Sequence, residues 1–161
     1  MLAPSARARD LQAGRRALRH GELTDVVAVA PSLPLSTRSS MPIPVGVRAN
    51  VATALARGAF DVVHAVDPGV PGLSYVALVE ALCTTVAAFL DPERLSYPPR
   101  KTARDRLLAR IDVLIARSDA LAERASDRFP GSYVVVPEGV DPPAQRPTEA
   151  SRTIAVDTTA S

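Results

Sequence analysis

The sequence predicts an α/β protein with a Rossmann-like, doubly wound and mostly parallel sheet that has helices on both faces. Short apolar runs of strand length alternate five times with stretches of helical periodicity, and this alternation is typical of βαβ units. Apolar residues make up 47% of the 161 residues, a globular composition that allows one domain with a proper core. Right-handed crossovers would place helices on both faces of the sheet.

Residues 1–20 form a basic segment that is expected to be helical. Five arginines accompany a single acid, Asp10, and Leu11, Ala17 and Leu18 give the helix an apolar side. Such a pattern is typical of a solvated surface helix. The alternative is a basic face that contacts anionic lipid. The segment also resembles an organellar presequence, which the strand that follows so closely disfavours.

The next elements are a strand, an edge segment and a helix. Asp25–Ala30 is a continuous apolar run that Pro31 is expected to end, and Ser32–Ser40 is a polar loop. The alternating prolines of Met41–Val47 suit an extended edge segment. A helical face then recurs every four residues from Val47, and Gly58 is its stop signal.

The rest of the chain is organised around Phe60–Pro68, which has the composition of a strand buried on both faces. Proline and glycine forbid a longer strand after Asp67. His64 and Asp67 therefore arrive at the carboxyl end of a buried strand, the edge where open α/β sheets bind ligands.

Strand and helix patterns continue to alternate after this turn. The expected elements are a buried helix over Leu73–Cys83, a strand over Thr84–Leu90, a loop over Asp91–Pro99, a helix over Lys101–Arg110, a strand over Asp112–Ala116, a helix capped by Ser118 and a strand over Tyr133–Val136. The predicted domain spans residues 21–142. Residues 143–161 are a Pro, Thr, Ser and Ala-rich tail or the start of a second domain, with Thr153–Val156 as a strand without partners.

Composition excludes several classes of function. Aromatic residues make up only 4% with no tryptophan, net charge is +2, and no uninterrupted basic run occurs, so a nucleic-acid partner is not expected. Cys83 is the only cysteine, which precludes an intrachain disulfide and fits a reducing cytoplasm. His20, His64 and Cys83 lack metal-ligand spacing. No apolar stretch is long enough to span a bilayer and no export signal is evident. A cytoplasmic location follows, with peripheral contact at the inner face of the membrane as an alternative.

Motifs for nucleotide binding and hydrolysis are also missing. Gly69 and Gly72 have the wrong spacing for a dinucleotide fingerprint, so they are expected to serve the strand-to-helix turn, or to expose N–H groups to an anion. No G-x-S-x-G elbow supplies a nucleophile. No cofactor is therefore expected.

Polar residues follow several predicted strands. His64 and Asp67 could form a base and its orienter, or His64 could bond to a neighbouring loop. Asp91 and Glu93 follow another strand, with Arg94 and Arg100 nearby. Glu138 and Asp141 follow the last one and could face the same cleft. The alternative for the Asp91 loop is a solvated surface loop.

The runs ALARGAFDVVHAVDP and RIDVLIARSDALAERASDRFPGSYVVVPEGVDP resemble the amino-terminal domain of family 4 glycosyltransferases. Members have the GT-B architecture, in which two Rossmann-like domains face each other across a cleft. The resemblance implies transfer of a sugar from a nucleotide-sugar donor to an acceptor, with this domain forming the acceptor side. His64 matches the first histidine of the family strand DVVHAHDP, Asp67 and Pro68 match its Asp-Pro, and Ser118 matches the serine of its VSEA segment. Gly139 matches the glycine of its NGVD loop. The residues expected to contact substrate are His64, Asp67, Pro68, Asp91, Ser118, Glu138 and Gly139, and no catalytic residue is assigned.

The sequence departs from the family pattern at several points. Val66 stands where a second histidine is common, Leu90 where a histidine usually meets the acceptor, and Glu138 where asparagine is usual. The donor domain that holds the nucleotide diphosphate is not recognisable. The chain is therefore expected to be inactive alone, as part of a truncated or split enzyme. The alternative function is a non-catalytic binding or scaffold module that exposes an apolar surface. A third hypothesis, a small nucleotide-binding Rossmann domain, is disfavoured by the missing glycine fingerprint.

Overall fold

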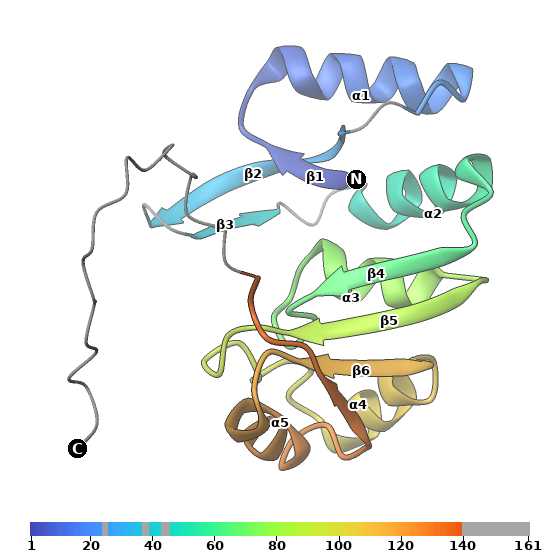
Figure 1. Cartoon of the computed structure of the whole chain (residues 1–161). Helices are drawn as coiled ribbons and strands as arrows, with labels where there is room; N and C mark the ends of the chain where they lie inside the picture. The colour runs from blue at the N-terminus through green and yellow to red at the C-terminus, as the bar shows by residue number, and fades with distance from the viewer. Residues whose placement is uncertain (24–25, 37–38, 43–45, 140–161) are drawn as a thin grey trace, which may run out of the picture.

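The computed structural model describes residues 1–23, 26–36, 39–42 and 46–139 and shows a Rossmann-like α/β fold (Figure 1). The strands form two sheets, with orders β1-β2-β3 and β4-β5-β6-β7, in which every pair is parallel except β2 with β3. The elements in chain order are β1 (Leu2–Ser5), α1 (Ala8–His20), β2 (Val27–Ser36), β3 (Ser39–Pro42), α2 (Val47–Gly58), β4 (Val62–Val66), α3 (Leu73–Glu80), β5 (Thr84–Phe89), α4 (Lys101–Leu108), β6 (Val113–Ala116), α5 (Asp119–Ser126) and β7 (Tyr133–Val135).

The first sheet differs from the prediction in two ways. β1 was not expected, because four residues that include a proline carry no strand signal. It pairs in parallel with β2, from Leu2 opposite Val27 onward. Pro31 does not end β2, which continues to Ser36 and pairs antiparallel with β3. Most of the predicted loop Ser32–Ser40 is therefore strand, and its residues 37 and 38 lie outside the described residues. A proline lacks a donor but still offers its carbonyl, so it can remain in a strand where its missing N–H is not needed.

The basic segment is helical only over Ala8–His20, since Leu2–Ser5 forms β1, and this helix is part of the core. Leu18 of α1 is buried in a cluster with Val27 and Val29 of β2 and Val51 of α2. Gly14 lies against the backbone of β2, where an added Cβ would stand 2.0 Å from the Ala28 carbonyl oxygen. The face of α1 that carries Gly14 and Leu18 is therefore fixed against the sheet, while its arginines remain exposed.

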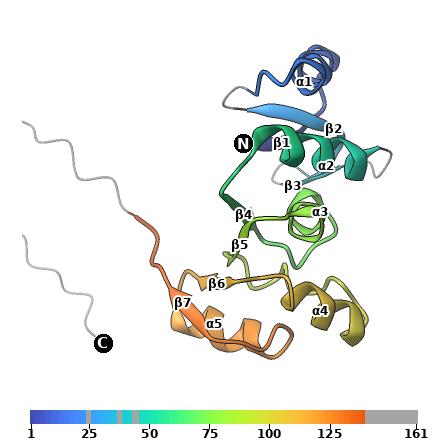
Figure 2. The ribbon, with the colours of Figure 1, turned by 90° about the vertical axis from the view of Figure 1, so that its right-hand side faces the viewer.

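The second sheet follows the predicted order of strands and helices closely. All three of its strand pairs are parallel. Leu78 of α3, Leu107 of α4 and Ala125 of α5 pack into one cluster with Phe89 of β5 and Leu114 of β6. Figure 2 shows α3 and α4 on the same side of the strands. This common side is the main core of the protein.

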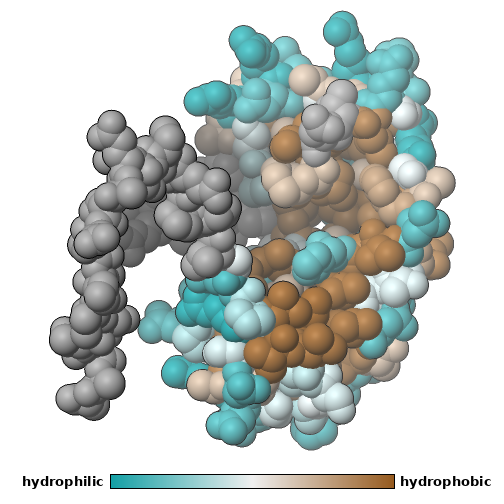
Figure 3. All heavy atoms as spheres, in the orientation of Figure 1, coloured by the Kyte–Doolittle hydropathy of each residue, from teal (hydrophilic) through white to brown (hydrophobic). Residues whose placement is uncertain are grey.

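The opposite face of this sheet is exposed at several positions. β4 alternates between exposed and buried residues, with Val62 51% and Val66 45% exposed while Val63 and Ala65 are buried. Val134 and Val136 near β7 are also half exposed. Figure 3 shows apolar side chains gathered over this region. The prediction that Phe60–Pro68 is buried on both faces is therefore wrong, because none of α3, α4 and α5 packs on this side.

β1 and β4 belong to different sheets but line one cavity together. A mostly apolar cavity of about 340 Å³ is lined by residues of β1, β2, α2, β4 and α3, among them Leu2 and the four consecutive residues Val62, Val63, His64 and Ala65. Only the edge of a strand presents consecutive residues to one space, since successive side chains point to opposite faces. The edge of β4 therefore lines this cavity together with residues of β1, α2 and α3.

Tyr133 makes the stability of this core sensitive to alkaline pH. Its hydroxyl donates a 2.8 Å hydrogen bond to the Phe129 carbonyl, and burial raises its pKa well above 10. Because the folded state disfavours the tyrosinate, Tyr133 contributes its full stabilisation below pH 10. This stabilisation is lost as the pH rises through the raised pKa of Tyr133 in the folded protein. We expect the free energy of unfolding to fall between pH 8 and pH 11 by less in Tyr133→Phe than in the wild type, as measured by urea denaturation at both values. An equal fall in the two proteins would contradict this assignment.

Candidate functional site

The carboxyl edge of the four-stranded sheet carries a chain of polar groups. Parallel strands bring the residues that follow them to the same edge, where α/β sheets bind ligands. Asp67 follows β4, Asp91 follows β5, Arg117 and Ser118 follow β6, and Glu138 follows β7. Of these residues, the sequence predicted that Asp67, Asp91 and Glu138 would follow strands of the sheet, and it did not single out Arg117.

Asp67 is the most firmly held residue of the edge. It is 7% exposed and has a left-handed backbone with φ of 47°. Its Oδ1 accepts hydrogen bonds from the backbone N–H groups of Leu90, at 2.8 Å, and of Asp91, at 3.2 Å. Its own N–H donates to the Ala88 carbonyl at 2.8 Å. Asp67 thus ties the end of β4 to the end of β5.

A short acidic and basic network extends from this carboxylate toward solvent. Arg94 places Nη1 3.8 Å from Asp67 Oδ2 and Nε 3.5 Å from Asp91 Oδ2. Asp91 Oδ1 also accepts the Glu93 N–H at 2.9 Å, which shapes the start of the loop. Since the Asp91 side chain is 45% exposed, its carboxylate can meet a ligand directly, whereas that of Asp67 is largely enclosed.

The loop after β5 is packed tightly against the turn after β4. The Tyr97 N–H donates to the Gly69 carbonyl at 2.7 Å, and Tyr75 and Tyr97 contact edge to face with centroids 4.9 Å apart. Arg104 donates to the Pro98 and Pro99 carbonyls at 3.0 and 2.8 Å. Pro68 is fully buried at the start of this turn. The edge is thus built on a loop whose backbone is held at several points.

Replacing Gly69 with alanine is expected to destabilise this junction. A Cβ at Gly69 would lie 2.1 Å from the Arg94 carbonyl oxygen and 2.9 Å from Leu95 Cα. These are backbone atoms, so relief requires a loop shift that we expect to cost about 1–3 kcal/mol in urea denaturation. Gly139→Ala is the matched control, since nothing lies within 4 Å of its added Cβ. Equal losses in both variants would contradict the close packing of this turn.

The far end of the edge is more exposed. The Ser118 hydroxyl accepts the Leu121 N–H at 3.3 Å and caps α5 as predicted. Arg117 Nη1 lies 3.4 Å from Glu138 Oε1, with the two side chains 42% and 74% exposed. Gly139 is exposed beside Glu138. Asp141 lies outside the described residues.

His64 is not brought together with Asp67. It is the third residue of β4, and its side chain lies on the exposed face with Val62 and Val66. Within the described part of the chain, no hydrogen bond joins His64 to Asp67 or to a neighbouring loop. Two residues separate them, but Asp67 is buried and turned toward the end of β5.

Sequence reasoning did not single out Arg117. It directly follows Ala116, the last residue of β6, so its place at the edge was readable from the strand boundary. Its ion pair with Glu138 could not be predicted from the sequence, because that pair depends on β6 lying beside β7.

Within the described residues, no group of three or more His, Cys, Asp and Glu side chains is placed to hold a metal ion. Nor does any described helix combine the length and the apolar character needed to cross a membrane.

These features define a Rossmann-like α/β domain whose polar groups gather at the carboxyl edge of a parallel sheet. Comparison with protein families gives a match to the model described as Glycosyltransferase Family 4, over residues 5–143. The chain belongs to this family. A search of curated proteins finds no match.

Proposed function

We propose that this chain forms the acceptor side of an enzyme that transfers a sugar from a nucleotide-sugar donor to an acceptor hydroxyl. Membership of glycosyltransferase family 4, over residues 5–143, is the observation that carries the proposal. The carboxyl-edge groups support it, because carboxylates at a sheet edge can accept hydrogen bonds from sugar hydroxyls.

The residues divide into two roles in this proposal. The exposed carboxylates of Asp91 and Glu138, with the backbone of Gly139, hydrogen-bond to the acceptor. Asp67, Pro68 and Ser118 hold the loops and the helix that carry them. Positioning of the attacking hydroxyl is then this domain's contribution to the reaction, since a well-oriented reactant lowers the barrier without any chemical step by the protein.

Stabilisation of the leaving nucleoside diphosphate is proposed to come from a second, donor-binding domain of the GT-B arrangement. Such stabilisation needs cations aimed at the developing charge. At this edge Arg94 and Arg117 are each already paired with carboxylates. We therefore infer that the chain alone, proposed to be cytoplasmic, does not turn over donor.

Two measurements test the proposal. Incubation of the full chain with labelled nucleotide sugars and a panel of sugar acceptors should give no transfer, and robust turnover would refute inactivity alone. Saturation-transfer NMR should detect acceptor sugars bound to the chain. That signal should weaken in Asp91→Asn/Glu138→Gln and persist in Glu123→Gln/Asp127→Asn, which makes the same charge change on and just after α5.

A second candidate function is a non-catalytic binding module. The exposed valines of the open sheet face, including Val62, Val66, Val134 and Val136, favour it. Absence of any acceptor signal in the NMR experiment, for the wild type as for the double variant, would support this module over the acceptor domain.

A further inference from the structure

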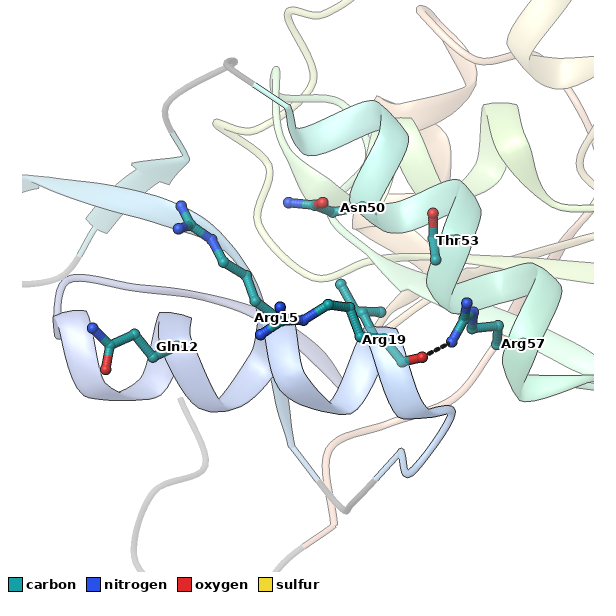
Figure 4. Close-up of a pocket in the computed structure, with 7 residues that line it drawn as sticks. Gln12, Arg15, Arg19, Asn50, Thr53 and Arg57 are labelled. Atoms are coloured by element: carbon teal, nitrogen blue, oxygen red, sulfur yellow. Dashed lines mark hydrogen bonds between the residues drawn. The ribbon is translucent and has the colours of Figure 1, made fainter.

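A cavity of about 500 Å³ lies between α1 and α2 and is lined by three arginines, Arg15 and Arg19 from α1 and Arg57 from α2. Figure 4 shows these side chains, with Asn50 and Thr53, around the gap between the two helices. The remaining lining residues are Gln12 and Leu18, so the lining holds no carboxylate. Three guanidinium groups around one cavity create a local positive potential.

Several basic side chains elsewhere in the described residues form ion pairs, unlike the three arginines of this cavity. The ion pairs of that part of the chain use Arg48, Arg94, Lys101 and Arg117. None of them includes an arginine of this cavity. Asp10, the acid of α1, instead accepts a hydrogen bond from the Ser5 hydroxyl at 2.9 Å. Among the described residues, the three positive charges therefore have no acidic partner.

The two helices are held in a fixed relation around the cavity. Arg57 donates to the Arg19 carbonyl at the end of α1, and Asn50 Nδ2 donates to the Val29 carbonyl of β2 at 2.8 Å. Leu18, only 6% exposed, packs beneath the cavity in the cluster shared by α1, β2 and α2. This packing pre-orients the helices that carry the arginines, which lowers the entropic cost of binding a ligand.

The cavity lies at a different edge of the sheets from the carboxyl edge. Arg57 is in the last turn of α2, which leads into the start of β4, and Arg19 is in the last turn of α1, which leads into β2. These cations are therefore at the amino edge of the sheets, opposite the edge that carries Asp67 and Glu138. A ligand here would not compete with an acceptor.

We propose that this cavity binds a phosphate-bearing anion. A guanidinium group offers a planar fork of N–H donors that matches phosphate oxygens, and it stays charged at all physiological pH values. Arg15 and Arg19 are exposed, and among the described residues neither guanidinium group donates a hydrogen bond or forms an ion pair, so their donors are available. The phosphate is either that of a lipid headgroup or that of a soluble phosphate compound. The inference does not rest on the proposed transferase function.

The test uses the full chain and two kinds of probe. Inorganic phosphate and pyrophosphate are titrated by calorimetry, and vesicles of phosphatidylcholine, with or without phosphatidylglycerol, are used for co-sedimentation. Binding of the soluble anions identifies a soluble phosphate site. Binding only to the vesicles that contain phosphatidylglycerol identifies a headgroup site. In either case we expect binding to weaken as salt is added.

Matched variants assign the binding to this cavity. Arg15→Gln/Arg19→Gln should weaken binding by about tenfold or more, since it removes two charge-assisted contacts. Both side chains are exposed, so the variant should fold, which circular dichroism would verify. Arg106→Gln/Arg124→Gln removes the same charge from exposed positions on α4 and α5 and should bind like the wild type. Binding to none of the probes, or equal losses in the two double variants, would overturn the proposal.

Discussion

Replacing Phe89 with alanine is expected to lower the free energy of unfolding by about 3–5 kcal/mol. The Phe89 side chain is fully buried, and its ring lies 5.0 Å from that of Phe129 and 5.9 Å from that of Tyr133, between centroids. Truncation removes these contacts and leaves a cavity among α3, α4, α5 and the sheet. Since a domain of this kind is stable by about 5–15 kcal/mol, the loss is a large share of the total.

Urea denaturation followed by circular dichroism measures this effect, with Val134→Ala as the control. Val134 is 53% exposed on the other face of the same sheet, so its truncation should cost less than about 1 kcal/mol. If Phe89→Ala does not fold, Phe89→Leu should still fold with an intermediate loss. Equal effects of Phe89→Ala and Val134→Ala would show that the core does not lie on the helix-covered side.

Replacing Asp67 with alanine is expected to cost about 2–4 kcal/mol, because the backbone N–H groups of Leu90 and Asp91 lose their acceptor. The left-handed backbone at this position, with φ of 47°, adds strain for alanine. Asp67→Asn keeps an acceptor oxygen and tolerates that backbone, so we expect a loss nearer 1 kcal/mol.

Urea denaturation and amide hydrogen exchange together identify this role. The Leu90 and Asp91 amides should exchange faster in Asp67→Ala, while amides in the middle of β5 change only with global stability. Asp91→Ala is the comparison, since among the described residues its exposed carboxylate contacts only the Glu93 N–H and Arg94. The assignment fails if Asp67→Ala and Asp91→Ala have the same stability and the two amides exchange as in the wild type.

The local elements of the second half were largely predictable from the sequence. The strand Thr84–Phe89, the helix from Lys101 and the cap at Ser118 follow from residues that lie next to one another in the chain. Apolar runs, helical periodicity and capping residues carry their information over short distances. The same signals placed Asp67, Asp91 and Glu138 after strands, and hence at one edge.

The first sheet was less predictable. β1 is short and contains a proline, and β2 continues through Pro31 and Pro34. Their pairing decides that they are strands, because hydrogen bonds to a neighbouring strand can outweigh weak local preference. The sequence pattern therefore missed the antiparallel pairing of β2 with β3.

The sequence by itself determined the order of strands and helices from α2 onward, the resemblance to the family, and the positions of Asp67, Asp91 and Glu138 after strands. Tertiary structure decided which of these side chains are buried and hydrogen-bonded and which are exposed. Asp67 is buried and accepts hydrogen bonds from N–H groups after β5, and His64 is exposed on one face of β4. Arg117, after β6, forms an ion pair with Glu138, after β7. It also brought Arg15 and Arg19 to face Arg57 across one cavity. The physical reason is that burial and pairing depend on packing between segments far apart in the chain, whereas local patterns report only what each segment prefers alone.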